Sequence, residues 1–292
     1  MKNNSVTPDE KQIDRRIIKN KLAKGVFFLG TLFGIIVLAA LLIRIFTQGI
    51  AYLDFGFLSN FASRRPEDAG IRAAILGTIW IMSITIPVSL ILGVSTSIYL
   101  EEYAPRNKFT RFIELNLANL AGVPSVVFGL LGLTVFVRLL EMGRSILAGG
   151  FTMSLLILPV IVVASKEAIR AIPQEQYDAA YAMGATKWQI IRTVVLPAAT
   201  PGILTGAILS LSRGVGETAS LLMIGAMTFI AYTPASVLDG FTVLPIQIFS
   251  WASRPQAEFQ AVAAAGSIVL LVILIVMNTL AIIIRNNYSK RY

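Results

Sequence analysis

Long stretches without a charged side chain constrain this sequence more than any other feature. One of them, residues 261–284, runs for 24 positions without an acidic or basic residue. A helix of that length measures about 36 Å, which is more than the hydrocarbon core of a bilayer requires. The whole chain is 55% hydrophobic with a mean hydropathy of +0.74, well above an ordinary soluble domain. The sequence therefore predicts an all-α protein that crosses a membrane several times.

Six transmembrane helices are predicted along the chain. The third contains Pro124 and several glycines, so we expect it to be kinked or broken there. The fourth is short, contains Pro159, and could begin as early as Ile146. The predicted spans are residues 25–46, 71–100, 115–140, 151–165, 201 to about 232, and 261–284.

The composition excludes several functions. The chain has no cysteine and no histidine, which rules out disulfides, thiol catalysis and the commonest zinc ligands. It contains no G-x-x-x-x-G-K-[ST] pattern, so it cannot hydrolyse ATP through a P-loop of its own. We therefore expect no catalytic residue, no metal site and no cofactor in this chain.

The distribution of basic residues predicts the orientation. With six spans, both termini and the polar segment 166–199 lie on one side, together with 17 of the 25 Lys and Arg residues and all nine lysines. The positive-inside rule places that side in the cytoplasm. The predicted layout is a cytoplasmic tail (1–24), a first span with an external loop (25–70), a transmembrane core (71–284) and a cytoplasmic tail (285–292). The net charge of +9 follows from this topology, so nucleic acid is not needed to explain it.

Residues 173–197, PQEQYDAAYAMGATKWQIIRTVVLP, are soluble-looking sequence between apolar runs, and we call them the elbow. Pro173 suits the start of a helix, Gly184 suits its end, and Thr186 with Gln189 matches a capping box for a second helix that Pro197 closes. Each helix is predicted to have one apolar face, formed by Tyr177, Ala180 and Tyr181 on the first and by Trp188, Ile191 and Val195 on the second. Such an elbow could dock into a groove of a partner, or it could simply cap a membrane bundle.

The elbow resembles the EAA loop of ABC-importer permeases, whose pattern is E-A-A-x3-G-x9-I-x-L-P. The matching residues are Asp178, Ala179, Ala180, Gly184, Val194, Leu196 and Pro197, with Asp in place of Glu and Val in place of Ile. In that family the loop inserts into a cleft of the ATPase subunit and couples ATP hydrolysis to movement of the gate. The resemblance implies the same role for the elbow.

The segment 212–219, SRGVGETA, places two charges within the predicted fifth span. An Arg near the centre of a bilayer costs about 2.5–3.5 kcal/mol on insertion scales, so Arg213 needs a reason to be there. Arg213 and Glu217 are four residues apart, so on one helix they can pair. A guanidinium matches an oxyanion with two parallel hydrogen bonds.

Two roles for this segment remain open. In the first, Arg213 is a transient anion site on the transport path and Glu217 orients it. Around them, Ser212 and Thr218 would supply hydroxyls, while Gly214 and Gly216 would leave backbone accessible. In the second, the Arg–Glu pair locks this helix to a neighbouring helix or to a partner subunit.

Further segments resemble the permeases of phosphate ABC importers. They are the start of the second span (GIRAAILGT, residues 70–78), the run GVPSVVFG (122–129) and the segment around Arg213. The resemblance implies the type I ABC-importer permease fold, a location in the cytoplasmic (inner) membrane, and transport of inorganic phosphate. It also implies a second homologous permease, a dimer of ATP-binding subunits that bind the ATP, and an extracytoplasmic phosphate-binding protein. A permease for another oxyanion (sulfate or molybdate) and an ATP-independent channel or transporter are the alternatives.

Overall fold

A computed structural model describes residues 10–227 and 229–289 of the chain, and every regular element among them is helical. Three short segments, η2, η3 and η4, are π-helical, and η1 is a 3-10 turn. In chain order the elements are α1 (Glu10–Gly49), η1 (Ile50–Tyr52), α2 (Phe55–Ser59), α3 (Arg72–Ile98), η2 (Tyr99–Tyr103), α4 (Lys108–Leu120), α5 (Ser125–Gly132), η3 (Leu133–Leu139), α6 (Ile146–Arg170), α7 (Gln174–Ala182), α8 (Lys187–Ile190), η4 (Ile191–Val195), α9 (Leu196–Val215), α10 (Ala219–Ile224), α11 (Leu244–Ala252) and α12 (Ala257–Ser289).

The helices account for the expected crossings. In the described chain, five are long and apolar enough to span a membrane, and a bent pair can serve as the sixth. That pair is Lys108–Leu120 with Ser125–Leu139, and the chain bends by 106° between them. The break lies at Pro124, which cannot continue the helix that precedes it. The interruption expected in the third span is therefore confirmed.

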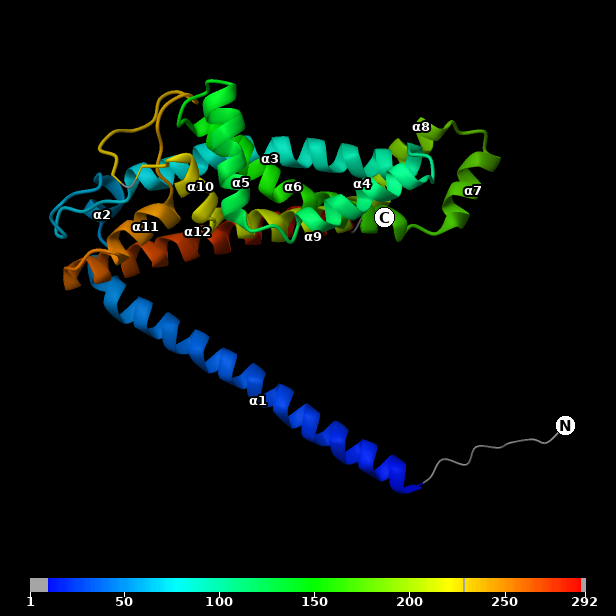
Figure 1. The fold of residues 1–292 in the computed structure, drawn as a ribbon, viewed down its shortest axis with the longest axis horizontal. Helices are drawn as coiled ribbons and strands as arrows, with labels where there is room; N and C mark the ends of the chain where they lie inside the picture. Colours follow the sequence, from blue (N-terminus) through cyan, green and yellow to red (C-terminus); the bar gives the residue numbers. More distant parts are fainter. Residues whose placement is uncertain (1–9, 228, 290–292) are drawn as a thin grey trace.

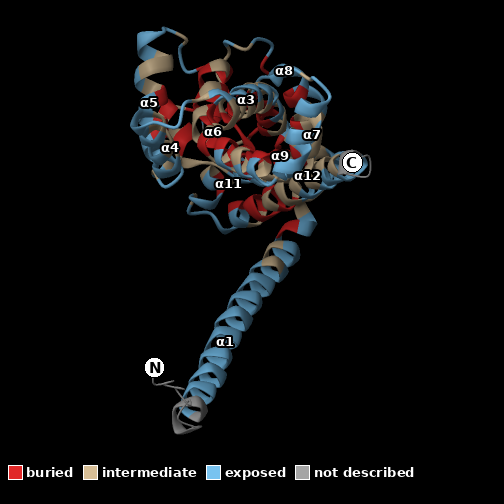
Figure 2. Ribbon diagram, turned by 90° about the vertical axis from the view of Figure 1, so that its right-hand side faces the viewer, coloured by how far each residue is buried: buried red, intermediate tan, exposed pale blue. Residues whose placement is uncertain are grey.

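The core of the bundle lies between α3, α6 and α9. In Figure 2 the buried residues gather among these helices, and α6 packs against both α3 and α9. The central cluster includes Ile81 from α3 and Met153, Ile157 and Ile161 from α6. A second cluster packs α11 and α12 around Trp251. A third lies beneath the elbow. The bundle is elongated, with the elbow at one end and α2, α10 and α11 at the other (Figure 1).

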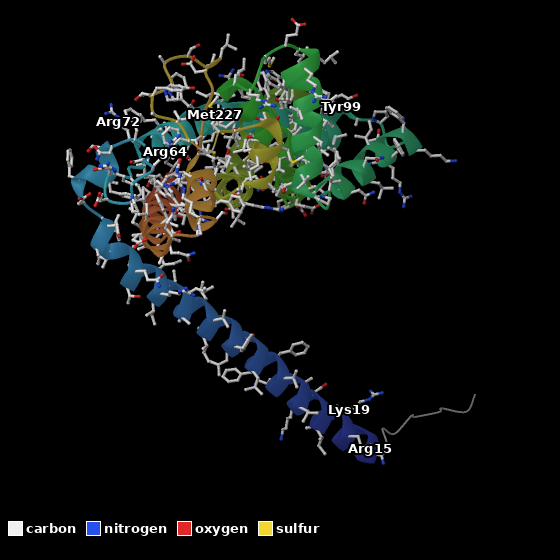
Figure 3. The ribbon with its side chains drawn as sticks, turned by 60° about the vertical axis from the view of Figure 1, so that its left-hand side comes forward. Arg15, Lys19, Arg64, Arg72, Tyr99 and Met227 are labelled. Atoms are coloured by element: carbon white, nitrogen blue, oxygen red, sulfur yellow. The ribbon has the colours of Figure 1, made fainter. Side chains whose placement is uncertain are left out.

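The first helix stands apart from this bundle. α1 leaves the bundle at the end opposite the elbow and runs obliquely away from it (Figure 1), and its apolar window is 0% buried. It contacts α12 near its C-terminal end, where Gly49 lies against the backbone of α12. A side chain placed at Gly30 or Gly34 would meet nothing within 4 Å. Figure 3 shows Arg15 and Lys19 near the free end of α1, far from Arg64 and Arg72.

Several predicted boundaries differ from the structure. α1 is one helix from Glu10, so the described part of the predicted tail continues the span. The predicted loop 233–260 contains α11, and α12 continues beyond residue 284 to Ser289. The predicted fifth span lies within residues 201 to about 232, whereas the observed helix runs from Lys187 to Val215 and α10 follows after a break. Residues 1–9 and 290–292 of the predicted tails lie outside the described residues.

Candidate functional site

The elbow has the local structure that its sequence predicts. α7 is followed by Gly184 at φ +78°, a left-handed conformation that strains a residue with a side chain. Thr186 caps α8 and both halves of the capping box are present, because Gln189 also accepts a hydrogen bond from the Thr186 amide. Pro173 is the residue just before α7. The helix–glycine–helix elbow is therefore confirmed.

The exit from the elbow is different from the prediction. Pro197 does not close the second helix, because α8 continues through the π-helical η4 into α9. Pro197 sits in the first turn of α9, where its missing N–H falls at the change from π- to α-helical bonding. The result is one continuous helix from Lys187 to Val215, 29 residues long. At the helical rise this is about 43 Å, so one rod joins the elbow to the region of Arg213.

The elbow divides its apolar residues between the bundle and solvent. Tyr177 and Ala180 pack on the apolar cluster beneath the elbow, and Ile191 is fully buried. Trp188 is 59% exposed, so its predicted place on one face with Ile191 and Val195 is wrong. Three large side chains remain exposed on the elbow, namely Tyr181, Met183 and Trp188. Among the matched positions of the motif, Asp178, Ala179 and Gly184 are exposed, while Ala180, Leu196 and Pro197 are half-buried.

Near the other end of the same rod, Arg213 borders a small hollow. The hollow has a volume of about 110 Å³. Its walls are mostly apolar and come from the α4–α5 break, α6 and α9, with Leu120, Val123, Phe128, Leu156 and Ser210 among them. Arg213 is exposed, and within the described residues no hydrogen bond or ion pair involves its guanidinium. A guanidinium without a protein partner has its donors free to bind an oxyanion through two parallel hydrogen bonds.

The predicted pairing of Arg213 with Glu217 is wrong. α9 ends at Val215, so the two residues do not share a helix face. The Glu217 carboxylate instead accepts a hydrogen bond from the backbone N–H of Ser220, at 3.2 Å, in the first turn of α10. That contact satisfies one of the amides that a helix start leaves free. Glu217 therefore helps to begin α10 and does not orient Arg213.

The other predicted residues of this segment do not converge on the hollow. The Ser212 hydroxyl bonds to the Ile208 carbonyl at 2.6 Å and to the side chain of Asn278 on α12. Gly214 is buried, and a side chain there would meet Ile157 of α6 at 2.6 Å, so its backbone is not accessible as predicted. Gly216 is exposed just past the end of α9, and Thr218 precedes α10. Of the six residues, Arg213 is the one that lines the hollow.

Two groups of polar residues escaped the sequence analysis. The first is Asn278, whose side-chain amide is the only one in the apolar span 261–284, and that was its available signal. The second group is a charged cluster at the elbow end of the bundle, formed by Glu101, Glu114, Lys166 and Arg170. Lys166 and Arg170 are four residues apart on α6, but their acidic partners come from other helices, which the sequence does not reveal.

Solved structures of low sequence identity share this fold. A bacterial alginate ABC transporter, crystallised with an alginate pentasaccharide-bound periplasmic protein, matches with a TM-score of 0.66, 16% identity, and coverage of 91% of this chain and 94% of the other. The MetNI methionine ABC transporter, in an inward-facing conformation, matches with a TM-score of 0.60 and 20% identity, covering 75% of this chain and 95% of the other. The fold is that of a type I ABC-importer permease.

Sequence comparison gives the family. Residues 86–292 match the family described as "Binding-protein-dependent transport system inner membrane component", and the chain belongs to it. The "Probable ABC transporter permease protein YqgI" of Bacillus subtilis is 33% identical over 91% of this chain and 95% of its own length. "Phosphate transport system permease protein PstA 1" of Mycobacterium tuberculosis is 32% identical over 95% of this chain and 92% of its own. The protein is thus a multi-pass inner-membrane permease subunit of an ABC importer.

Proposed function

We propose that this chain is a membrane-spanning subunit of an importer that carries inorganic phosphate across the cytoplasmic membrane with energy from a separate ATPase. The observation that carries the mechanism is the continuous helix from Lys187 to Val215, which begins at the elbow and ends two residues after Arg213. A movement imposed on the elbow is delivered along this rod to the hollow. The substrate is supported by relatives named as phosphate transport permeases that align over most of the chain.

The exposed side chains of the elbow are its proposed contact with the ATPase. Tyr181, Met183 and Trp188 present apolar and aromatic surface at the elbow end of the bundle, which suits insertion into a cleft on a partner. When ATP closes a dimer of ATP-binding subunits, the two elbows of a permease pair move together and the gate opens toward a loaded extracytoplasmic phosphate-binding protein. This chain then contributes no catalysis and binds no cofactor, and ATP belongs to the ATPase.

Arg213 is the proposed transient contact for the anion. Its guanidinium has no protein partner among the described residues, so a passing oxyanion does not have to displace a carboxylate. A planar fork would bind sulfate or molybdate as readily as phosphate. The choice of phosphate therefore depends on the relatives' names, and discrimination belongs to the binding protein.

The basic residues support an orientation with both termini and the elbow in the cytoplasm. The absence of cysteine from the sequence makes a direct test simple. Met183→Cys on the elbow and Ser236→Cys in the loop at the opposite end both place a thiol at an exposed position. In intact cells a membrane-impermeant maleimide should label Ser236→Cys alone, and permeabilised cells should label both. The reverse pattern would overturn the orientation.

Purification of the tagged chain from its own membranes in mild detergent tests the assembly. Mass spectrometry should find a second permease, an ATP-binding subunit and a phosphate-binding protein. An ATP-binding subunit accompanied by a sulfate- or molybdate-binding protein would support the ABC-importer assembly and refute phosphate as the substrate. A chain that is purified alone, but that still transports in vesicles without ATP, would refute the proposal in favour of a channel.

A further inference from the structure

The end of α3 carries two adjacent carboxylates that face different parts of the molecule. Glu101 and Glu102 lie in the π-helical segment η2, directly after α3. Successive residues on a helix point in different directions, so one helix end can hold two neighbours at once. Glu101 contacts α6, and Glu102 contacts the elbow.

Glu101 belongs to the charged cluster that ties α3 to α6 and α4. Its carboxylate makes two contacts with Arg170, Nη2–Oε1 at 2.9 Å and Nε–Oε2 at 3.1 Å, and a third with Lys166 at 3.5 Å. Lys166 also pairs with Glu114 of α4 at 2.6 Å. The side chains of Glu101 and Lys166 are 13% and 12% exposed, so solvent screens this link weakly.

Both helices of the elbow donate hydrogen bonds to Glu102. The hydroxyl of Tyr177, on α7, donates a hydrogen bond to its carboxylate at 2.8 Å. The ammonium of Lys187, at the start of α8, donates to its backbone carbonyl and lies 4.9 Å from the ring of Tyr103. In the described part of the chain, every hydrogen bond that joins α7 or α8 to a helix outside the elbow ends on Glu102.

The chemistry of Tyr177 makes this contact durable. Burial and the Glu102 carboxylate both raise the pKa of the Tyr177 hydroxyl. The hydroxyl therefore keeps its proton at physiological pH and remains a donor. A bond from a hydroxyl to a carboxylate is also stronger than one between neutral groups.

We propose that Glu101 and Glu102 are positioning residues that pass movement of the elbow into α3 and α6. Glu102 holds the elbow through Tyr177 and Lys187, and Glu101 holds α6 through Arg170 and Lys166. When the elbow moves, the end of α3 moves with it, and Glu101 keeps α3 aligned with α6, which itself leads into α7, while the rod Lys187–Val215 moves directly. Movement of the elbow then reaches the gate by two routes, through the rod and through α3 with α6, and the two routes move together. This inference rests on the proposed function, in which an ATPase drives the elbow.

Tyr177→Phe tests the link, because it removes one hydroxyl and keeps the ring. We expect normal complex yield and normal basal ATP hydrolysis, but about tenfold less phosphate imported per ATP hydrolysed, as the loss of a charge-assisted hydrogen bond allows. Tyr99→Phe is the matched control. Tyr99 lies in η2, two residues before Glu101, is exposed, and its hydroxyl makes no hydrogen bond among the described residues. Its variant should behave as the wild type.

Two further variants separate positioning from simple packing. Glu102→Gln keeps an oxygen that accepts from Tyr177 and should retain most of the coupling, whereas Glu102→Ala should lose it. Combining Glu102→Ala with Tyr177→Phe should be no worse than Glu102→Ala alone, because both changes break the same bond. Additive losses, or a Tyr177→Phe variant that lowers complex yield while the remaining complex couples normally, would overturn the proposal.

Phosphate import by the wild-type complex, reconstituted in vesicles like the variants, separates the positioning role from the proposed function. If the wild type imports phosphate with ATP and Tyr177→Phe couples equally well, only the positioning role is refuted. If the wild type imports no phosphate, the proposed function fails. The positioning role is then judged by the transport of whichever oxyanion the complex carries.

Discussion

The two ends of the rod Lys187–Val215 are built in opposite ways. At the elbow end, Lys187 and Tyr177 bond to Glu102, and the charged cluster next to it satisfies four ionic side chains across three helices. At the other end, Arg213 borders an apolar hollow and has no polar partner among the described residues. A satisfied network fixes geometry, whereas an unpaired cation is free to bind something else. The elbow end is therefore suited to transmit force, and the Arg213 end is suited to bind a ligand or a partner subunit.

The largest expected effect comes from removing the Arg213 side chain. Arg213→Ala should abolish phosphate uptake and leave assembly intact, because no described contact within the chain depends on the guanidinium. Arg213→Lys should keep partial uptake, since an ammonium keeps the charge but not the planar fork. Uptake assays on purified complexes of equal yield provide the measurement. Normal uptake by Arg213→Ala would remove Arg213 from the path, and loss of assembly would favour a role in binding the partner subunit.

The second-largest expected effect comes from substituting Gly184, at the turn between the two helices of the elbow. Gly184 has φ +78°, and a side chain there would meet nothing within 4 Å, so backbone strain alone would penalise a substitution. A left-handed conformation costs a residue with a side chain about 1–2 kcal/mol, and a β-branched residue tolerates it worst. Gly184→Val should therefore cut phosphate-stimulated ATP hydrolysis strongly. Gly184→Asn should cut it mildly, because Asn accepts this conformation. Equal activity of the two variants would count against the elbow's geometry.

A comparison of two variants measures how much the charged cluster contributes to stability. Lys166→Met removes a poorly solvated cation that pairs with both Glu101 and Glu114 and leaves them Arg170, and we expect a loss of about 3 kcal/mol in unfolding free energy. Glu167→Gln removes a carboxylate that is 65% exposed and lies 3.6 Å from Arg170, so its cost should be about 0.5 kcal/mol or less. Thermal unfolding of the complex in detergent provides the comparison. Equal midpoints for both variants would mean that the cluster does not hold the helices together.

The smallest expected effect lies in the loop at the Arg213 end of the bundle. Backbone N–H groups of Ala235 and Ser236 donate to the Asp239 carboxylate and lower the pKa of Asp239. The stabilisation is therefore present above the ordinary pKa of an aspartate and is lost as the pH falls through the lower folded pKa. The protection factors of the two amides, taken relative to the intrinsic exchange rate at each pH, should fall in Asp239→Asn and in strong acid, with little change in transport. Unchanged protection factors would show that the carboxylate does not hold the loop.

Local sequence signals predicted the elbow because its structure depends on neighbouring residues. Gly184 provides the left-handed turn, and Thr186 with Gln189 closes a capping box within one turn. Apolar run length predicted the spans for a similar reason, since each span needs only its own sequence to be recognised.

The misses depend on distant contacts or on backbone changes that local sequence patterns do not indicate. The pairing of Arg213 with Glu217 failed because α9 stops at Val215, and the helix after the break, α10, packs against α5. Glu101 and Arg170 are 69 positions apart, and nothing local indicates that they meet. Pro197 was read as a helix end because the π-helical turn that accommodates it has no sequence signature.

The most direct test of the account is uptake of radiolabelled phosphate by the reconstituted complex, with ATP and the loaded binding protein supplied or withheld. We predict uptake only when both are present, and no competition from an excess of unlabelled sulfate or molybdate. Uptake without ATP would contradict an elbow-driven permease. Sulfate or molybdate competing as well as unlabelled phosphate would contradict the assignment of the substrate.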